Sequence, residues 1–151
     1  MGEVYRKLEK QLALNKGVRE LLAILTTSTK HVTGVLTGNL TPVADEKLTR
    51  TGIRAYFSEF FCADDYFDRT RLVENAVRTS TTKHGLKSRK EVIIVGDTPR
   101  DIDAANAAHA TSAGVASGVY TMTQLSEAGA THVYANLEPT KELLAMLGLM
   151  P

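Results

Sequence analysis

Apolar residues along this chain follow two spacings, and the two alternate. Residues such as Leu21, Leu22 and Leu25 recur at the three-to-four spacing of an amphipathic helix, whereas short runs such as Val92–Val95 are continuous and mostly β-branched. Helical spacing predicts helices over residues 2–14, 18–25, 42–51, 69–84, 99–108 and 138–147, and a further helix that begins at Thr121 or Thr123 and ends at Gly129. The short runs predict strands near residues 31–36, 58–62, 91–96, 112–116 and 131–135. Strands and helices that alternate from residue 31 onward favour a parallel, three-layer α/β sheet.

The most informative stretch reads EVIIVGDTPRDID, residues 91–103. Its apolar run suits a strand covered on both faces, and Pro99 suits the first turn of the helix that follows. Asp97 and Asp101 should therefore lie at the carboxyl end of a parallel strand, where open α/β sheets bind their ligands. Two carboxylates four residues apart can share Mg²⁺. Alternatively, Asp97 caps the helix and Asp101 balances its dipole.

A second stretch, HVTGVLTGN at residues 31–39, ends a predicted strand in Thr37-Gly38-Asn39. Gly38 lets the backbone approach a ligand, and Thr37 offers a hydroxyl beside backbone N–H groups. Such a group of donors can bind a phosphate oxygen. The alternative is a plain turn capped by Asn39.

Arg69 is a cation at the predicted start of a helix, where the helix dipole opposes positive charge. This placement favours a negative partner, which is either the neighbouring Asp68 or an anionic ligand. Both interpretations stay open on the sequence alone.

Composition narrows the class of protein. A length of 151 residues suits one domain with a real core, and a net charge of +1 without a basic cluster gives no footprint for nucleic acid. The single cysteine, Cys62, excludes an internal disulfide and suits a reducing compartment. No apolar run approaches a membrane span, and no secretory leader is visible. We expect a cytoplasmic protein that contacts neither membrane nor nucleic acid.

With these motifs placed, the chain resembles the haloacid dehalogenase-like (HAD) hydrolase superfamily, and within it the phosphoglycolate phosphatase-like members. The segments that carry the resemblance are GVRELLAIL, GVLTGN, EKLTRTGI, DRTRLVENA, VIIVGDTPRDIDAA and GVASGVYTMTQLSEAGATHV. The resemblance implies a three-layer, doubly wound core over residues 17–151. Residues 1–16 would then be a remnant of a helical cap or linker.

The resemblance also implies roles for individual residues. Thr37 would hold the transferring phosphoryl group, with Gly38 and Asn39 beside it. Asp97 would bind Mg²⁺ and Asp101 would support the waters of the metal. Arg69 would offset negative charge on nucleophile and phosphate, with Lys83 as the weaker candidate for that role. The substrate would be a small phosphorylated metabolite.

The chain departs from the family pattern at its most important point. HAD enzymes begin with a strand that ends in Asp-x-Asp-x-Thr and supplies the nucleophile, and no such segment occurs here. The only Asp-x-Asp is Asp101-Ile102-Asp103, inside a predicted helix. The chain therefore resembles the C-terminal two-thirds of a HAD phosphatase, without its nucleophile strand and most of its cap. Two smaller departures occur. His109 stands where the family usually has a helix-ending glycine, so that it is either strained or lengthens the helix. Ser117 stands where threonine is common.

Two functional hypotheses follow. In the first, the chain is an N-terminally truncated phosphatase of the aspartyl-phosphate type. It would be inactive as it stands, because the covalent step needs a carboxylate nucleophile. Its binding of Mg²⁺ would be weak or absent. In the second, it is a non-catalytic HAD-like domain that binds phosphate, metal or a protein partner. An unrelated doubly wound domain is disfavoured, since neither a receiver pattern nor Gly-x-Gly-x-x-Gly is present.

The absent strand leads to a structural prediction. In the family it lies between the strand that ends at Thr37 and the strand that ends at Asp97. A second copy or an upstream fragment could complete the sheet. We expect instead that the two strands close up, with residues 32–36 bonded directly to residues 92–96.

Overall fold

The computed structural model describes residues 14–64 and 66–149. The helix expected over residues 2–14 lies outside these residues except for its last position. The strands are β1 (Gly34–Leu36), β2 (Glu59–Phe61), β3 (Ile93–Gly96), β4 (Thr111–Val115) and β5 (His132–Tyr134). The helices are α2 (Val18–Thr27), α3 (Thr41–Arg50), α4 (Arg69–Lys83), α5 (Pro99–Ala107), α6 (Met122–Glu127) and α7 (Lys141–Met146), with short 3₁₀ turns η1 (Arg54–Tyr56) and η2 (Arg89–Glu91). No helix in this part of the chain is long and apolar enough to span a bilayer.

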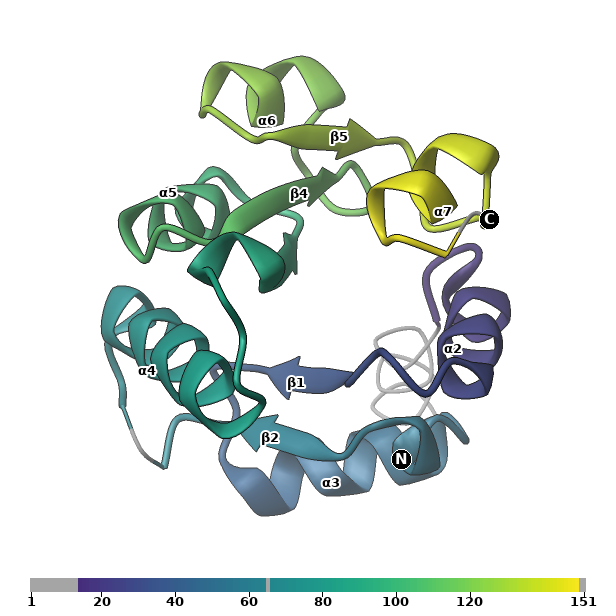
Figure 1. Cartoon of the computed structure of the whole chain (residues 1–151), viewed down its shortest axis with the longest axis vertical. Helices are drawn as coiled ribbons and strands as arrows, with labels where there is room; N and C mark the ends of the chain where they lie inside the picture. The colour runs from purple at the N-terminus through teal and green to yellow at the C-terminus, as the bar shows by residue number, and fades with distance from the viewer. Residues whose placement is uncertain (1–13, 65, 150–151) are drawn as a thin grey trace, which may run out of the picture.

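All strand pairs are parallel, which confirms the α/β class. β1 pairs with β2, while β3, β4 and β5 form a second sheet in that order. Helices cover both sides, with α4 and α5 on one side and α2 and α7 on the other (Figure 1). The fold is therefore the expected three-layer, HAD-like core, and every predicted strand is present within a few residues of its expected position.

The predicted pairing of residues 32–36 with residues 92–96 is wrong. β1 and β3 belong to different sheets and share no ladder. The reason lies in the helix layer, where α4 contacts both β1 and α5, and α5 contacts β3 and β4. Packed helices lie ~8–10 Å apart, which equals about two strand spacings of ~4.8 Å. A helix pair of this width corresponds to β1 and β3 lying about two strand spacings apart, which is too far for direct backbone bonds.

The core that fixes this spacing is built from α4, α5 and β3. Val73 and Val77 of α4 are fully buried against Ile94 of β3, and Leu36 of β1 packs against the same cluster. The face of α5 in this cluster is made of alanines, Ala104, Ala105 and Ala108. Small side chains let the two helices and the strand approach closely. Substitutions that change side-chain volume in this cluster would therefore lower the stability of the fold.

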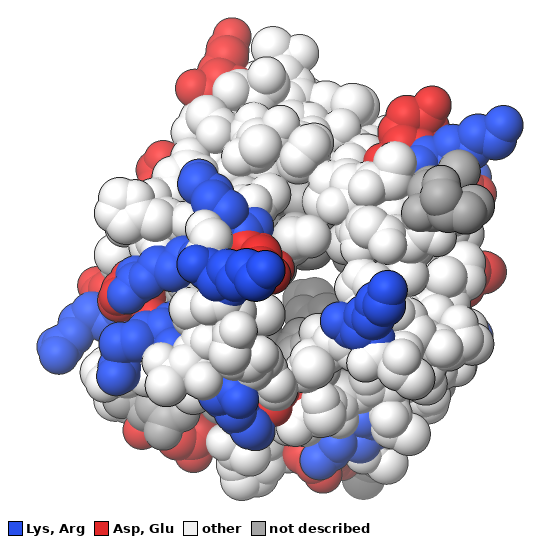
Figure 2. Space-filling model, in the orientation of Figure 1, with Lys and Arg blue, Asp and Glu red and all other residues white. Residues whose placement is uncertain are grey.

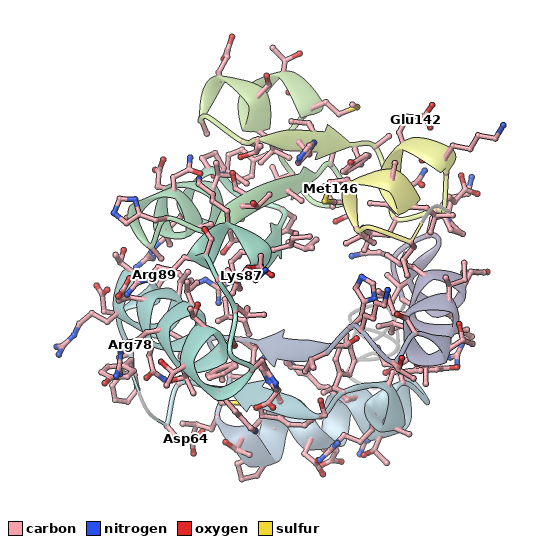
Figure 3. All side chains as sticks on the ribbon, viewed as in Figure 1. Asp64, Arg78, Lys87, Arg89, Glu142 and Met146 are labelled. Carbon is pink, nitrogen blue, oxygen red and sulfur yellow. The ribbon has the colours of Figure 1, made fainter. Side chains whose placement is uncertain are left out.

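Two helix ends show how loops are fixed. Asp64 lies beside the first turn of α3 (Figure 3), where its carboxylate accepts hydrogen bonds from the backbone N–H and the hydroxyl of Thr41 at 2.6 and 2.8 Å. These bonds lower the pKa of the Asp64 carboxyl, chiefly the hydrogen bond from the Thr41 side chain. At the end of α5, His109 has φ of 62°, the left-handed conformation that favours glycine.

Replacing His109 by glycine should stabilise the protein. The His109 side chain is exposed, so its loss removes little packing, whereas glycine relieves a left-handed strain of about 1 kcal/mol. Urea unfolding followed by circular dichroism should show a higher unfolding free energy for His109→Gly and no gain for His109→Ala. An equal gain in both variants would contradict this explanation.

Candidate active site

Asp97 directly follows the last residue of β3, so it lies at the carboxyl end of a parallel strand, as predicted. Thr98, not Asp97, caps α5, because the Thr98 hydroxyl accepts a hydrogen bond from the backbone N–H of Asp101 at 3.2 Å. Pro99 begins the helix. The alternative role of Asp97 as a helix cap is therefore wrong, and its carboxylate is left for other contacts.

Asp101 points from the first turn of α5 toward α4 and binds Arg69. Arg69 donates to one Asp101 carboxylate oxygen through Nε at 2.9 Å and through its terminal nitrogen at 2.7 Å. The two side chains are only 20% and 9% exposed. Gly96 makes this possible, because a Cβ there would lie 2.3 Å from the Asp101 Cβ. Asp68, the partner considered earlier, instead caps α4.

Lys83, the weaker candidate for the cationic role, lies at the opposite end of the same helix. It pairs with Glu59 at 2.6 Å, and His84 approaches the same carboxylate at 3.3 Å. Fourteen residues of α-helix place Lys83 ~21 Å along the axis from Arg69. The structure therefore brings Arg69, and not Lys83, to the Asp101 end of the fold.

Thr37, Gly38 and Asn39 follow β1 and form a turn. The backbone N–H of Thr37 still bonds to Phe61 of β2 at 3.0 Å. The Thr37 hydroxyl oxygen accepts bonds from the backbone N–H and the side-chain amide of Asn39, at 3.1 and 3.0 Å. The hydroxyl hydrogen can still be donated, and the space beside Gly38 is open. Asn39 therefore caps the turn, as the alternative interpretation predicted, and the Thr37 hydroxyl can still donate a hydrogen bond.

The loop after β4 adds a contact to Asp97. A Cβ on Gly118 would lie 2.7 Å from an Asp97 carboxylate oxygen, so the Gly118 backbone lies against that carboxylate. Ser117, noted in the sequence only as a departure, accepts a long hydrogen bond from the side chain of Asn15 at 3.3 Å. Sequence reasoning missed Gly118, although a glycine just past a strand was a usable signal for a close approach.

The candidate residues fall into two groups. Asp97 and Asp101 follow β3 and Thr37 follows β1, while Arg69 binds Asp101 and begins α4, which contacts both β1 and α5. Among the hydrogen bonds and ion pairs of residues 14–64 and 66–149, none joins Thr37 to the other three. A groove of about 440 Å³ along α4 is lined by other residues, such as Tyr66, Arg71 and Arg78. The site is therefore spread over two strand ends and is not enclosed.

The residues present do not form a complete Mg²⁺ site. In the part of the chain that the structure describes, no three His, Cys, Asp or Glu side chains gather closely enough to hold a metal. Asp101 is already committed to Arg69, which leaves Asp97. A cation bound here would lack a second free carboxylate from these residues.

Comparison with known proteins identifies the family. Residues 1–115 match the sequence model described as haloacid dehalogenase-like hydrolase. Among solved structures, a predicted phosphoglycolate phosphatase from Haemophilus somnus aligns with a TM-score of 0.72 and 22% identity. The alignment covers 86% of this chain and 58% of the Haemophilus chain. A putative phosphatase from Clostridium difficile aligns with a TM-score of 0.73 and 24% identity, and the alignment covers 94% of this chain and 67% of the Clostridium chain. No curated protein sequence matches the chain.

The chain belongs to the haloacid dehalogenase-like hydrolase family and has the fold of its phosphatase-like members. It spans 58% of the Haemophilus protein and 53% of a predicted phosphatase from Clostridium acetobutylicum. A large part of those structures thus has no counterpart in these 151 residues.

Loss of Asp101 should destabilise the fold strongly. Asp101→Asn leaves the mostly buried Arg69 without its counter-charge, for which we expect a loss of roughly 3 kcal/mol in unfolding free energy. Lys83→Met is the matched control at the other end of α4, where Lys83 is 56% exposed and the expected loss is below about 1 kcal/mol. Equal losses in the two variants, measured by urea unfolding, would contradict a special role for the Arg69–Asp101 pair.

Proposed function

We propose that this chain is the phosphate-recognising part of a HAD-type phosphatase that hydrolyses a small phosphomonoester through an aspartyl-phosphate intermediate. The observation that carries the proposal is the buried Arg69–Asp101 pair beside Asp97 at the carboxyl end of β3. A guanidinium with one edge fixed by a carboxylate keeps further donors for the oxygens of a phosphate.

Each residue has a distinct task in this proposal. The Thr37 hydroxyl donates to a phosphoryl oxygen, and the open backbone at Gly38 lets that oxygen approach. Arg69 offsets the charge that accumulates on the phosphoryl group, while Asp101 fixes the direction of its guanidinium. Asp97, held against Gly118, orients the opposite side of the group or a cation bound there.

The same residues cannot carry out the covalent step. The nucleophile of an aspartyl-phosphate mechanism must be a free carboxylate aimed at phosphorus. Asp101 is committed to Arg69, and Asp97 lies in the turn that opens α5 rather than within a strand facing Thr37. The second candidate function is therefore a non-catalytic domain that binds phosphate, metal or a protein partner, and the divided site is the observation that favours it.

The substrate class and the compartment are also proposals. A small phosphorylated metabolite fits a site with one fixed guanidinium and one hydroxyl donor. The protein from Haemophilus somnus that shares the fold is a predicted phosphoglycolate phosphatase, which supports the same substrate class. Cys62 is a buried free thiol, which suits the reducing cytoplasm.

Hydrolysis should be absent from the purified chain. With p-nitrophenyl phosphate and Mg²⁺, we expect wild type and Asp97→Asn to release nitrophenol at the same background rate, because none of the residues that the structure describes supplies the nucleophile. General acid–base catalysis alone contributes roughly 10²–10⁴-fold, so a working site would be obvious. Turnover that disappears in Asp97→Asn would show that the nucleophile lies within this sequence.

Phosphate binding tests the proposed function directly. Inorganic phosphate titrated into labelled protein should shift the NMR signals of the Arg69 Nε–H and the Thr37 amide. We expect Arg69→Met to weaken binding by roughly tenfold or more, the usual worth of a charge-assisted hydrogen bond. Arg69→Lys should also bind more weakly than wild type, because an ammonium keeps the charge but lacks the fixed, planar donors of the guanidinium.

Lys83→Met is the matched control for phosphate binding, and it should bind like wild type. An equal loss in Lys83→Met, or unchanged binding in a folded Arg69→Met variant, would contradict the proposed phosphate site.

A further inference from the structure

The groove along α4 lies apart from the candidate active site. Its volume is about 440 Å³, and Thr70, Arg71 and Arg78 are among the residues that line it from α4. Ala107 and Ala108 line it from the C-terminal end of α5. Because alanine side chains are short, they leave a hollow between the two helices. None of the described lining residues belongs to the proposed phosphate site.

The charge of this groove is positive. Among the ion pairs of residues 14–64 and 66–149, neither Arg71 nor Arg78 takes part. Glu74, the acidic side chain among the described lining residues, is neutralised by Arg89, whose Nη1 donates to both carboxylate oxygens at 2.9 Å. The lining therefore keeps two positive charges that no described carboxylate balances.

The figures show the same distribution of charge. Lysine and arginine side chains gather over α4 and the segment that follows it on the face shown in Figure 2. Figure 3 places Arg78 and Arg89 beside this helix. A ligand that binds in the groove would thus meet a cationic surface.

Most N–H groups of the two arginines are available to a ligand. The Arg71 guanidinium lies over the ring of Tyr66, 5.3 Å from the ring centroid, and stacking of this kind uses none of its donors. Arg78 donates one hydrogen bond, to the side-chain carbonyl of Asn75 at 3.1 Å. Since a guanidinium carries five N–H donors, each arginine can still bind a carboxylate through two parallel hydrogen bonds.

Arg71 and Arg78 also have a defined spacing. Seven residues of α-helix correspond to ~10.5 Å along the axis and nearly two full turns, so the two arginines lie on the same side of α4. A polyproline II segment rises ~3.1 Å per residue and turns once in three residues. Acidic residues three positions apart in such a segment therefore lie on one side, ~9.3 Å from each other. This distance matches the arginine spacing within the reach of the side chains.

The width of the groove favours an extended chain over a helix. From Thr70 to Arg78 the groove follows ~12 Å of α4, so about 440 Å³ corresponds to a cross-section roughly 6 Å across. An α-helix with its side chains is ~10–12 Å wide, whereas neighbouring extended chains need only ~4.8 Å. The groove thus has room for one extended chain.

We propose that this groove binds an extended, acidic segment of a partner protein, with Asp or Glu at every third position and proline or other apolar residues between them. Two successive acidic side chains would bind Arg71 and Arg78. The residues between them would pack on Ala107 and on the ring of Tyr66. A polyproline II chain suits such a site because its conformation is already formed before binding. The inference does not rest on the proposed function.

Three fluorescein-labelled peptides of equal length test charge and spacing: GEPPEPPEG, GEEEPPPPG and GKPPKPPKG. The first carries an acid at every third position, the second has the same composition with its acids adjacent, and the third reverses the charge. Fluorescence anisotropy at low ionic strength should show binding of the first peptide. The second should bind roughly threefold more weakly or worse, and the third should not bind, because charge and spacing must both match.

Matched variants of the chain locate the bound peptide. Arg71→Gln and Arg78→Gln should each weaken binding of the first peptide by roughly three- to tenfold, the usual range for a partly exposed charged hydrogen bond. Arg50→Gln removes an exposed arginine of α3 that pairs with Glu46, and this variant should bind like wild type. Ala107→Leu fills the groove at an exposed position without changing charge, so it should weaken binding while the protein stays folded.

Several outcomes would overturn the proposal. These are no binding of the first peptide, equal binding of the first two peptides, or unchanged binding in folded Arg71→Gln and Arg78→Gln variants. An equal loss in Arg50→Gln would show a general charge effect. Displacement of the peptide by a single-stranded oligonucleotide of equal charge would show a surface for any polyanion, and it would likewise contradict a site for an acidic peptide.

Discussion

The packing of α4 against α5 is the contact on which the rest of this structure depends. It sets the distance between the parts of the sheet beneath the two helices, because two helix diameters cover more width than two adjacent strands. The alanine face of α5 brings the helices close together, and the buried valines of α4 fill the space above Ile94. β1 and β3 cannot come within bonding distance while α4 and α5 stay packed side by side above them.

The same helix contact builds the charged half of the candidate site. Arg69 is the first residue of α4 and Asp101 lies in the first turn of α5, so their ion pair joins the two helices at one end of the interface. The requirement for glycine at position 96 links that pair to β3 as well. The spacing between β1 and β3 is therefore coupled to the geometry of the candidate site, since a change that lets the two strands pair would also shift the Arg69 guanidinium.

Local patterns predicted the elements well because each element is specified by its own residues. The run at residues 92–95 and Pro99 located β3 and the start of α5, and His109 stood out as the non-glycine residue where a helix ends. Partners distant in sequence were harder to predict. Arg69 and Asp101 are thirty-two residues apart, and only the packed helices show that Arg69 binds Asp101 and not Asp68. The predicted pairing of β1 with β3 was wrong because the prediction took account of the spacing between strands but not of the width of the helices that pack on them.

Disulfide trapping measures the separation of β1 and β3 most directly. In a Cys62→Ser background, each of Gly34, Val35 and Leu36 is combined as cysteine with each of Ile93, Ile94 and Val95 and exposed to mild oxidation. Disulfides require Cα atoms within about 7 Å, and two strand spacings amount to ~9.6 Å. We predict no bond in any of these pairs, and formation in the control pair of Val35 with Phe60, which are neighbours in the β1–β2 ladder. Rapid bond formation between the β1 and β3 positions would contradict the account, because it would show that the two strands come within bonding distance of each other.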